Sequence, residues 1–394
     1  LSDNLLEKFP TAVATMPVLE DLDLSENNLQ DAVPSGWVQS LVNIDFSSNR
    51  LTSVPDDIFS IPSLQSLKLG RNGLYQKLPG AVSFNLVTLD LSNNRIYGSI
   101  PSTWTNLQRL NEFSLNNNIL GGSISSDVTT NMPVLVKFQV QRNVLTGSLP
   151  AFAPSISINE LYFQDNAFTG SIPAVYAQLQ SLVTLNVTNN KLSGDPSPLF
   201  NIQSLQKLHL SRNKFVGNWQ SVSQPPQLED LLLSDNQFTG ALPSFGGALI
   251  NLDLSNNFFT GSFSEAAALN LTNLVTLDLS NNQLSGSIPL AIRNLFKLSS
   301  LNLGFNQFAS NITELSLPSL EQLVYLNMEK NQLTGSVPVL HPNLKYLSLA
   351  SNKLSGVVSA SFLNIHQNLS LLNLGNNSLT GSIRELVNRL TNLE

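Results

Sequence analysis

The side chains best suited to chemistry are few and widely spaced in this sequence. Its histidines are His209, His341 and His366, and none of them lies at a spacing that suggests a metal pair. Cysteine is absent, which excludes disulfides, thiolate metal ligands and cysteine nucleophiles. The sequence also has no glycine-rich phosphate loop and no nucleophile elbow. We therefore expect neither an enzyme nor a cofactor-binding protein.

Pairs of aspartates are the remaining candidates for a metal site. Asp23 with Asp45, and Asp253 with Asp278, occupy equivalent positions in successive copies of a repeated segment. In neighbouring strands the carboxylates of each pair would lie roughly 4.8 Å apart and repel each other unless solvent or a cation screened them. Calcium is one reading, but Asp-Leu-Ser is also a common surface solution in such a repeat. No metal site is predicted.

These aspartates belong to a repeat that runs along the chain. The stretch 274–289, LVTLDLSNNQLSGSIP, contains the pattern L-x-x-L-x-L-x-x-N-x-L-x-G-x-I-P. The mean period is about 23 residues. The Asn of the pattern recurs in sixteen units, at positions 27, 49, 72, 94, 118, 143, 166, 190, 213, 236, 257, 282, 306, 331, 352 and 377.

One repeat shows how the units stack. Leu22 and Leu24 are two residues apart, so in an extended segment both point inward while Asp23 points outward. Each unit can bury its apolar side only against its neighbours, which places the short strands side by side in a parallel sheet. Asn27 ends the strand, where its amide can bond backbone groups that the turn leaves unpaired. The Asn column is interpreted as scaffold.

The second half of each repeat is interpreted as core and turn. Gly allows the tight backbone of segments such as TGSIP at 169–173, and Pro ends them because it lacks a backbone donor. Three segments depart most from the pattern, 193–200, 217–227 and 308–322, and are expected to be convex or lateral loops. The apolar residue that follows the Asn is Leu or Phe and is expected in the core at Leu145, Phe168, Leu192, Phe215, Phe238, Phe259, Leu284 and Phe308.

Together, the T/S-G-x-I-P half and the L-x-x-L-x-L-x-x-N-x-L half resemble the plant-type leucine-rich repeat of receptor kinases, receptor-like proteins and polygalacturonase inhibitors. The resemblance covers essentially the whole chain. It implies an α/β-type solenoid, a leucine-rich repeat superhelix with one short parallel strand per repeat on its concave face, about sixteen full repeats and partial repeats at both ends. It also implies an extracellular, non-catalytic segment of a receptor-like protein that binds peptide, protein or glycan ligands on its concave or lateral face.

The outward residues of the strands indicate where such a ligand would bind. Between the two strand leucines, both flanks of the array are repetitive, whereas units six to nine are chemically mixed. Tyr and Arg often carry binding energy in recognition surfaces. A solvated sheet face with drifted residues explains the same composition. The candidate ligand-binding residues are Lys137, Gln139, Arg142, Glu160, Tyr162, Gln164, Asp165, Lys207, His209, Arg212 and Leu232, the last taken as exposed. A second candidate patch comprises Phe305, Tyr325, Lys330, Lys345 and Tyr346.

Net charge and glycosylation motifs narrow the range of expected partners. The net charge is −7 and no basic run could neutralise a row of phosphates, so nucleic acid is not an expected partner. In a secreted protein, N-x-S/T motifs are acceptors for N-linked glycans. The candidate glycan sites are Asn186, Asn270, Asn311, Asn368 and Asn376. A glycan on Asn186 would obstruct the candidate concave surface.

The ends of the sequence leave two hypotheses open. We expect a single array over 1–394, with partial repeats at 1–6 and 391–394 and without terminal caps. In the first hypothesis the chain is part of a longer receptor-like ectodomain. In the second, uncapped copies stack head to tail into an extracellular filament, because the phase at 391–394 continues into that of Leu1.

Overall fold

The computed structural model describes residues 1–30, 33–154, 156–219, 223–358, 362, 365–366 and 368–381. The chain divides into two compact units, Leu1–Gly194 and Asp195–Glu394, and each is described by itself. The repeat pattern continues through both units. The predicted partial repeat at 391–394 lies outside the described residues, and a single array over 1–394 stays a prediction.

In the first unit, one three-residue strand per repeat pairs in parallel with the strand of the next repeat. The alternation of Leu with polar residues sets the register, because every strand turns its central apolar residue inward. The strands of this sheet are β1 (Asp21–Asp23), β2 (Asn43–Asp45), β3 (Ser66–Lys68), β4 (Thr88–Asp90), β6 (Glu112–Ser114), β8 (Lys137–Gln139), β10 (Glu160–Tyr162) and β12 (Thr184–Asn186).

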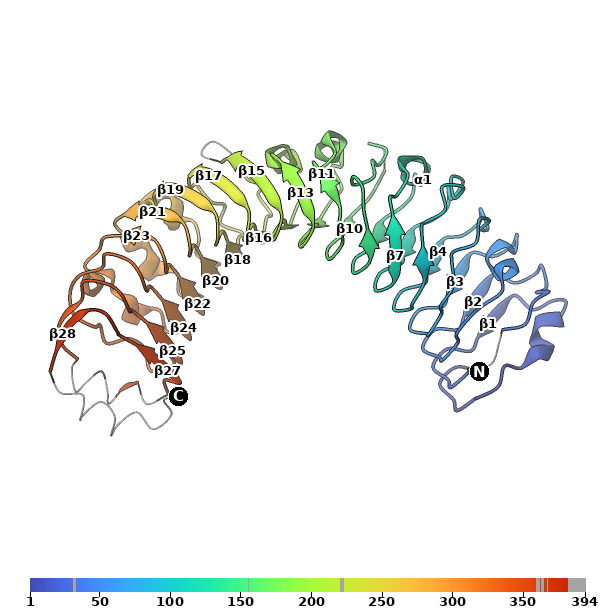
Figure 1. Ribbon diagram of the computed structural model, residues 1–394, viewed down its shortest axis with the longest axis horizontal. Helices are drawn as coiled ribbons and strands as arrows, with labels where there is room; N and C mark the ends of the chain where they lie inside the picture. Colours follow the sequence, from blue (N-terminus) through green and yellow to red (C-terminus); the bar gives the residue numbers. More distant parts are fainter. Residues whose placement is uncertain are drawn as a thin grey trace. The chain divides into compact units, whose positions relative to one another are not determined.

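The second unit repeats this arrangement. Its strands also pair in parallel and in the order of the sequence. Within each unit the strands line the inner side and the helical turns lie on the outer side (Figure 1). The strands are β14 (Lys207–His209), β16 (Asp230–Leu232), β18 (Asn251–Asp253), β20 (Thr276–Asp278), β22 (Ser300–Asn302), β24 (Tyr325–Asn327), β25 (Tyr346–Ser348) and β27 (Leu371–Asn373).

A second set of strands, which the sequence pattern does not predict, forms where each repeat carries its T/S-G half (Figure 1). Gly240 shows why glycine is needed there: its φ is +85°, and a Cβ would collide with the side chain of Asn218. The three segments expected to be loops, 193–200, 217–227 and 308–322, each begin inside one of these strands. These lateral strands are β5 (Tyr97–Gly98), β7 (Ile119–Gly122), β9 (Val144–Leu145), β11 (Thr169–Gly170) and β13 (Lys191–Gly194) in the first unit, and β15 (Lys214–Asn218), β17 (Gln237–Ala241), β19 (Phe258–Ser262), β21 (Gln283–Gly286), β23 (Gln307–Phe308), β26 (Ser355–Val357) and β28 (Ser378–Thr380) in the second.

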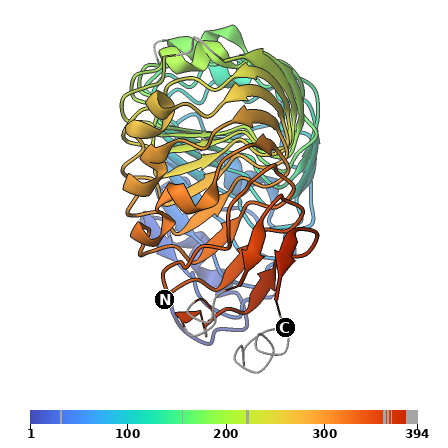
Figure 2. The same cartoon turned by 90° about the vertical axis from the view of Figure 1, so that its left-hand side faces the viewer.

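Short helical turns close the outer side of each unit. In Figure 2 the turns of the second unit stand on one side of the array and its strands on the other. In the first unit these turns are η1 (Thr11–Thr15), η2 (Asp56–Ser60), α1 (Ser126–Thr130) and η3 (Ala174–Gln178). In the second they are η4 (Ser197–Asn201), α2 (Glu265–Leu269), η5 (Leu290–Asn294), η6 (Ile312–Leu315) and η7 (Leu317–Ser319).

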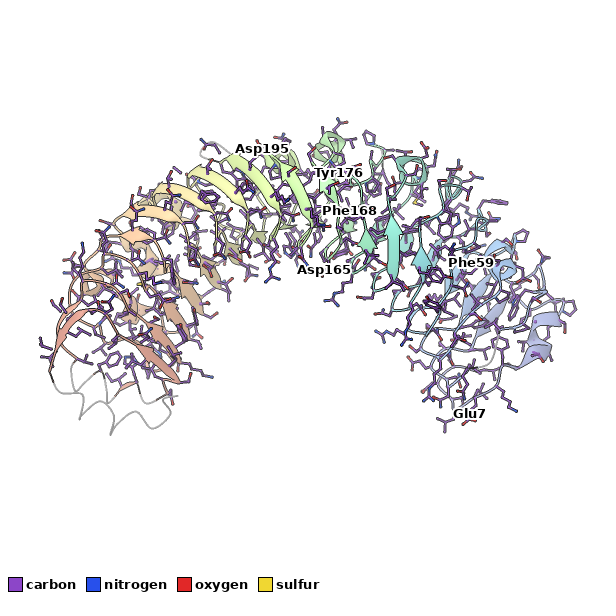
Figure 3. The ribbon with its side chains drawn as sticks, viewed as in Figure 1. Glu7, Phe59, Asp165, Phe168, Tyr176 and Asp195 are labelled. Atoms are coloured by element: carbon purple, nitrogen blue, oxygen red, sulfur yellow. The ribbon has the colours of Figure 1, made fainter. Side chains whose placement is uncertain are left out.

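The core fills the space between strands and turns. The Leu or Phe that follows the Asn is fully buried at every predicted position, from Leu145 to Phe308, which confirms the core prediction. In the first unit, Tyr176 is also fully buried, and its hydroxyl donates to the carbonyl oxygen of Pro150 at 2.9 Å. Figure 3 shows Phe168 inside the first unit and Tyr176 toward its outer side.

The Asn column holds successive repeats together, as the scaffold interpretation predicts. In the second unit, Asn257 Oδ1 accepts the backbone N–H of Phe238 at 3.0 Å. Its Nδ2 donates to the carbonyl oxygen of Leu233 at 3.0 Å and to those of Leu254 and Ser255 at 3.2 and 3.0 Å. One buried amide thus satisfies backbone groups of its own repeat and of the repeat before it. Residues 1–6 show the same geometry, since Leu6 N–H donates to Asn27 Oδ1 at 3.0 Å.

Replacing one amide of this column tests its structural role. We expect Asn257→Leu to lower the free energy of unfolding by about 3 kcal/mol or more, because one N–H and several carbonyl groups would lose their buried partner. Asn257→Asp should also be destabilised at neutral pH, because a carboxylate would face carbonyl oxygens, and should recover in part in acid. Urea denaturation measures both effects. Gln237→Ala, an exposed position, is the control, and equal stability of Asn257→Leu and this control would contradict the role.

A buried histidine near the end of the described region makes stability depend on pH. His366 is fully buried, its Nε2 accepts the N–H of Leu340 at 3.0 Å, and its ring packs 4.5 Å from that of Phe362. Burial, with a smaller contribution from His341, lowers the pKa of His366 from 6.5 to about 4. Between these values the unfolded chain binds a proton that the folded chain does not.

We therefore expect the melting temperature to fall as the pH decreases from about 6.5 to about 4, and this contribution to end below the lower value. The variant His366→Gln should lose this part of the pH dependence, whereas His341→Gln should keep most of it because burial is the larger cause. Differential scanning calorimetry across this pH range compares the three proteins. An unchanged pH profile in His366→Gln would contradict the assignment.

Candidate ligand-binding face

In the first unit, the predicted cluster lies on β8 and β10 and on the residues that follow them. Lys137 and Glu160 are cross-strand neighbours, and their Nζ–Oε2 distance is 3.4 Å. The two side chains are 36% and 37% exposed, so water screens the ion pair and its contribution to stability is at most about 1 kcal/mol. Both charges are therefore available to a ligand at little cost.

Tyr162 and Gln139 lie opposite each other on the same two strands. Gln139 Oε1 accepts the hydroxyl of Ser114 at 3.0 Å, so this amide already has a partner. Burial and the Glu160 carboxylate raise the pKa of Tyr162. The tyrosine hydroxyl thus stays protonated at neutral pH, and the side chains of Glu160 and Thr184 are its hydrogen-bond partners.

Two neighbouring glutamines carry amide oxygens without a hydrogen-bond partner. Gln141 Oε1 and Gln164 Oε1 are buried and accept no hydrogen bond from the described residues. Such groups are rare in folded proteins, and each needs a physical explanation. Gln164 was predicted from the sequence and Gln141 was not, although Gln141 lies two residues after Gln139 and therefore on the same face. Strand periodicity was the signal that could have found it.

Arg142 and Asp165 lie in the turns after β8 and β10, each directly before the Asn of its repeat. We call this position the corner of the repeat. Arg142 Nε lies 3.7 Å from Asp165 Oδ2, and the two side chains are 68% and 41% exposed. Asp165 Oδ1 also accepts Asn189 Nδ2 at 2.8 Å. Asp165 lies at the inner edge of the first unit (Figure 3).

The second unit contains the other part of the predicted cluster. His209 Nε2 lies 3.6 Å from Asp230 Oδ2, too far for a hydrogen bond, and this buried nitrogen has no hydrogen-bond partner among the described residues. Asp230 Oδ1 is held by Asn251 Nδ2 at 2.7 Å. Burial lowers the pKa of His209, although the Asp230 carboxylate opposes this effect. The imidazole is therefore neutral at pH 7.

The other predicted residues of the second unit surround this histidine. Lys207 and Arg212 are exposed, and Arg212 Nε lies 3.8 Å from Asp235 Oδ2. Leu232 is only half-buried rather than exposed as expected, because it stands between His209 and Asp253 on the neighbouring strands. The structure places Lys207, His209, Arg212 and Leu232 on or directly after β14 and β16.

The second candidate patch separates into two pairs and a lysine. The rings of Tyr325 and Tyr346 are stacked, with centroids 4.3 Å apart, and burial together with Tyr346 raises the pKa of Tyr325 to about 12. Lys330 Nζ lies 4.3 Å from the ring centroid of Phe305, a cation–π contact. The tyrosines lie at the start of β24 and β25, whereas Phe305 and Lys330 lie at the corners after β22 and β24. Lys345 directly precedes Tyr346.

The candidate glycan sites differ in exposure. Asn186 is half-buried at the end of β12, and its Oδ1 accepts the N–H of Thr188 at 3.0 Å. Asn311 is half-buried as well, and its side chain caps η6. Asn270, at the end of α2, together with Asn368 and Asn376, is exposed. Occupancy of these sites stays a prediction.

The aspartate pairs are occupied by protein donors. Asp278 Oδ1 accepts the N–H and the hydroxyl of Ser280 at 2.9 and 2.6 Å, and its Oδ2 accepts Asn302 Nδ2 at 2.9 Å. Burial, with the nearby Asp253 carboxylate, raises the pKa of Asp278. Within the described part of the chain, no group of three or more His, Cys, Asp and Glu side chains is placed to hold a metal ion.

The first unit has a recess of 440 Å³ away from the strand face. It is lined by residues such as Lys77, Gly98 and Thr103, which lie on the lateral strands and beyond them. None of the helices in the described ranges is long and apolar enough to span a membrane. The strand faces carry rows of polar side chains that are held by their cross-strand neighbours, as Lys137 is by Glu160 and Ser114 by Gln139.

Comparison with known proteins agrees with this geometry. The Leucine Rich Repeat family model matches residues 85–107, 181–202, 273–295 and 343–365. No curated protein matches the chain in sequence.

Solved structures match over nearly the whole length. The ectodomain of the Arabidopsis receptor kinase HAESA, in complex with an N-terminally extended IDA peptide hormone, is 30% identical with a TM-score of 0.85, over 96% of this chain and 69% of that one. The plant peptide hormone receptor RGFR1, in complex with RGF2, is 28% identical with a TM-score of 0.86, over 98% and 68%. A TDR receptor is 25% identical with a TM-score of 0.83, over 99% and 78%. The chain therefore belongs to the leucine-rich repeat family, and its repeats are of the plant type found in receptor-kinase ectodomains.

Proposed function

We propose that this chain is the ligand-binding part of an extracellular, receptor-like protein, that it is non-catalytic, and that a peptide or protein ligand lies across its strand face. The observation that carries the proposal is the pair of buried, unpartnered amide oxygens of Gln141 and Gln164. A buried acceptor without a donor costs stability. Both side chains are only half-buried, so they can turn their oxygens toward a ligand whose N–H groups would remove this cost.

A peptide backbone suits these acceptors because it presents N–H groups at regular intervals. Around the two glutamines, Lys137 and Glu160 offer one charge of each sign, and Tyr162 offers an aromatic ring whose hydroxyl is held by Glu160 and Thr184. These groups allow recognition of both backbone and side chains. The solved complexes of RGFR1 with RGF2 and of HAESA with an IDA peptide support a peptide as the ligand class.

The non-catalytic part of the proposal rests on how the polar groups are engaged. His209 is the histidine of the predicted cluster, and its Nε2 faces the carboxylate of Asp230 rather than a hydroxyl nucleophile. Asp230 is in turn held by Asn251. Neither contact includes a hydroxyl or thiol, and a catalytic base would need such a nucleophile within hydrogen-bond reach.

Two further parts of the proposal follow from the sequence alone. An extracellular location would make the exposed Asn270, Asn368 and Asn376 available to N-linked glycans, whereas a glycan on Asn186 would cover the strand face. Binding of a glycan ligand and head-to-tail stacking into a filament both stay predictions.

Replacing the two orphan acceptors separates binding from folding. We expect the double variant Gln141→Met/Gln164→Met to keep or raise the melting temperature, because two unpaired buried oxygens disappear while the volume is nearly conserved. Peptides are first selected on the wild-type chain from a phage-displayed random library. They should bind the double variant about tenfold more weakly than the wild-type chain, since two ligand hydrogen bonds are lost. Calorimetry and fluorescence anisotropy measure the two effects.

The matched control for this pair is Gln139→Met. Its amide already accepts Ser114, so this variant should lose stability instead. If the double variant binds every selected peptide with wild-type affinity, the two acceptors do not belong to the ligand site.

The second unit is tested by Lys207→Ala/His209→Ala/Arg212→Ala. The His209–Asp230 and Arg212–Asp235 contacts measure 3.6 and 3.8 Å and are loose, and His209 is neutral at pH 7, so the melting temperature should change by no more than about 3 °C. A subset of the selected peptides should lose tenfold or more in affinity. If every selected peptide binds this triple variant with wild-type affinity, Lys207, His209 and Arg212 do not contact the ligand.

A further inference from the structure

The residue before each Asn of the column has a left-handed backbone in every described repeat. Its φ lies between +50° and +58° from Asp3 to Asn376. Asn, Asp and Ser fill most of these corners, which agrees with their tolerance of this conformation. Six corners hold longer side chains instead: Glu26, Arg71, Arg142, Arg212, Phe305 and Lys330.

Bonds to the neighbouring repeats fix this conformation. The N–H of Arg142 donates to the carbonyl oxygen of Gln164 at 2.9 Å, and its carbonyl oxygen accepts the N–H of Asn118 at 3.2 Å. Arg71 is held in the same way: its N–H donates to the carbonyl oxygen of Ser92 at 2.9 Å, and its carbonyl oxygen accepts the N–H of Asn49 at 3.2 Å. A long side chain cannot relax this corner without breaking the stack, so its cost persists in the folded state.

Asparagine would satisfy these corners better than arginine does. In the first unit, Asn117 Nδ2 donates to Asn93 Oδ1 at 3.0 Å, and Asn189 Nδ2 donates to Asp165 Oδ1 at 2.8 Å. Corner residues of adjacent repeats therefore reach each other through short amide side chains. Arg142 pairs with the next corner, Asp165, but this exposed ion pair is too weak to offset the strain, and Arg71 has no such pair among the described residues, so binding is the reason we infer for both arginines.

Both guanidinium groups are available to an anion. Arg71 is exposed and makes no ion pair within the described ranges. Arg142 is 68% exposed, and its Nε lies 3.7 Å from Asp165 Oδ2, a loose contact that a bidentate carboxylate can replace. A guanidinium binds a carboxylate through two parallel hydrogen bonds, and this geometry favours acidic partners.

We propose that Arg71 and Arg142 hold these corners in order to bind two carboxylates of an acidic peptide segment that lies across the strand face of the first unit. This assignment rests on the proposed ligand-binding function and specifies the ligand class. The arginines are three strand intervals apart, roughly 14 Å. An extended peptide rises about 3.3 Å per residue, so its carboxylates would stand about four residues apart.

The first measurement is of stability. The variant Arg71→Asn/Arg142→Asn should melt about 2 °C or more above the wild-type chain, because two strained corners are relieved. Arg50→Asn/Arg95→Asn removes the same charge from two exposed positions that have no left-handed backbone, and should not melt higher. A corner variant that melts lower than the wild-type chain would overturn the argument from strain.

The second measurement is of binding to a fluorescein-labelled deca-glutamate peptide at low ionic strength, by anisotropy. The corner variant should bind at least fivefold more weakly, whereas Arg50→Asn/Arg95→Asn should stay within twofold of the wild-type chain, and deca-glutamine should not bind. Equal losses in both variants would show general charge attraction and overturn the assignment. Tighter, Arg71- and Arg142-dependent binding of a dextran sulfate oligomer of equal charge would overturn the peptide part.

These outcomes are separable from those of the proposed function. Suppose that binding of the phage-selected peptides depends on Gln141 and Gln164 but binding of deca-glutamate does not depend on Arg71 and Arg142. The proposed ligand-binding function then stands, and the proposal of an acidic ligand is wrong. If no selected peptide depends on the glutamines, the proposed function fails even where the corner variant still melts higher.

Discussion

The structure depends on one side-chain amide per repeat. Asn257 accepts the N–H of Phe238 from the preceding repeat and donates to Leu233 of that repeat and to Leu254 and Ser255 of its own. A strand of three residues makes too few hydrogen bonds to hold its position, and the turn after it leaves several groups unpaired. The buried amide solves both problems, because it satisfies the turn and joins two repeats at the same point.

Because the amide fixes the turn, the outward side chains need only bond within their own repeat or to the next strand. Leu277 and Leu279 pack inward and are fully or almost fully buried, whereas Asp278 between them makes only local and cross-strand bonds. The same division holds where the outward residues are unusual, as at Tyr162 between Leu161 and Phe163. A change on the outward face therefore alters what the chain binds with little effect on whether it folds.

The sequence predicted this division because it is periodic, and it failed where a feature depends on three-dimensional neighbours. The buried Leu and Phe positions and the Asn column follow from spacing alone. The lateral strands do not, because their pairing of Thr239 with Phe258 is offset from the repeat and depends on the positive φ of glycines such as Gly240. Nor did spacing show that Leu232 is half-covered or that Gln141 lacks a partner, since both depend on the side chains of adjacent strands.

The repeat also determines how often an extended ligand can be contacted. Strands follow one another at roughly 4.8 Å, whereas an extended peptide advances about 3.3 Å per residue, so the two periods differ. They coincide most closely after two strands and three residues, at roughly 9.6 and 9.9 Å, and again to within about 1.2 Å after three strands and four residues. A peptide laid across the strands is then read at intervals rather than at every repeat, and regular repeats between the contact points need only be polar. The corners of the first unit fit this expectation, since Arg71 and Arg142 are separated by Asn93 and Asn117, which bond to each other.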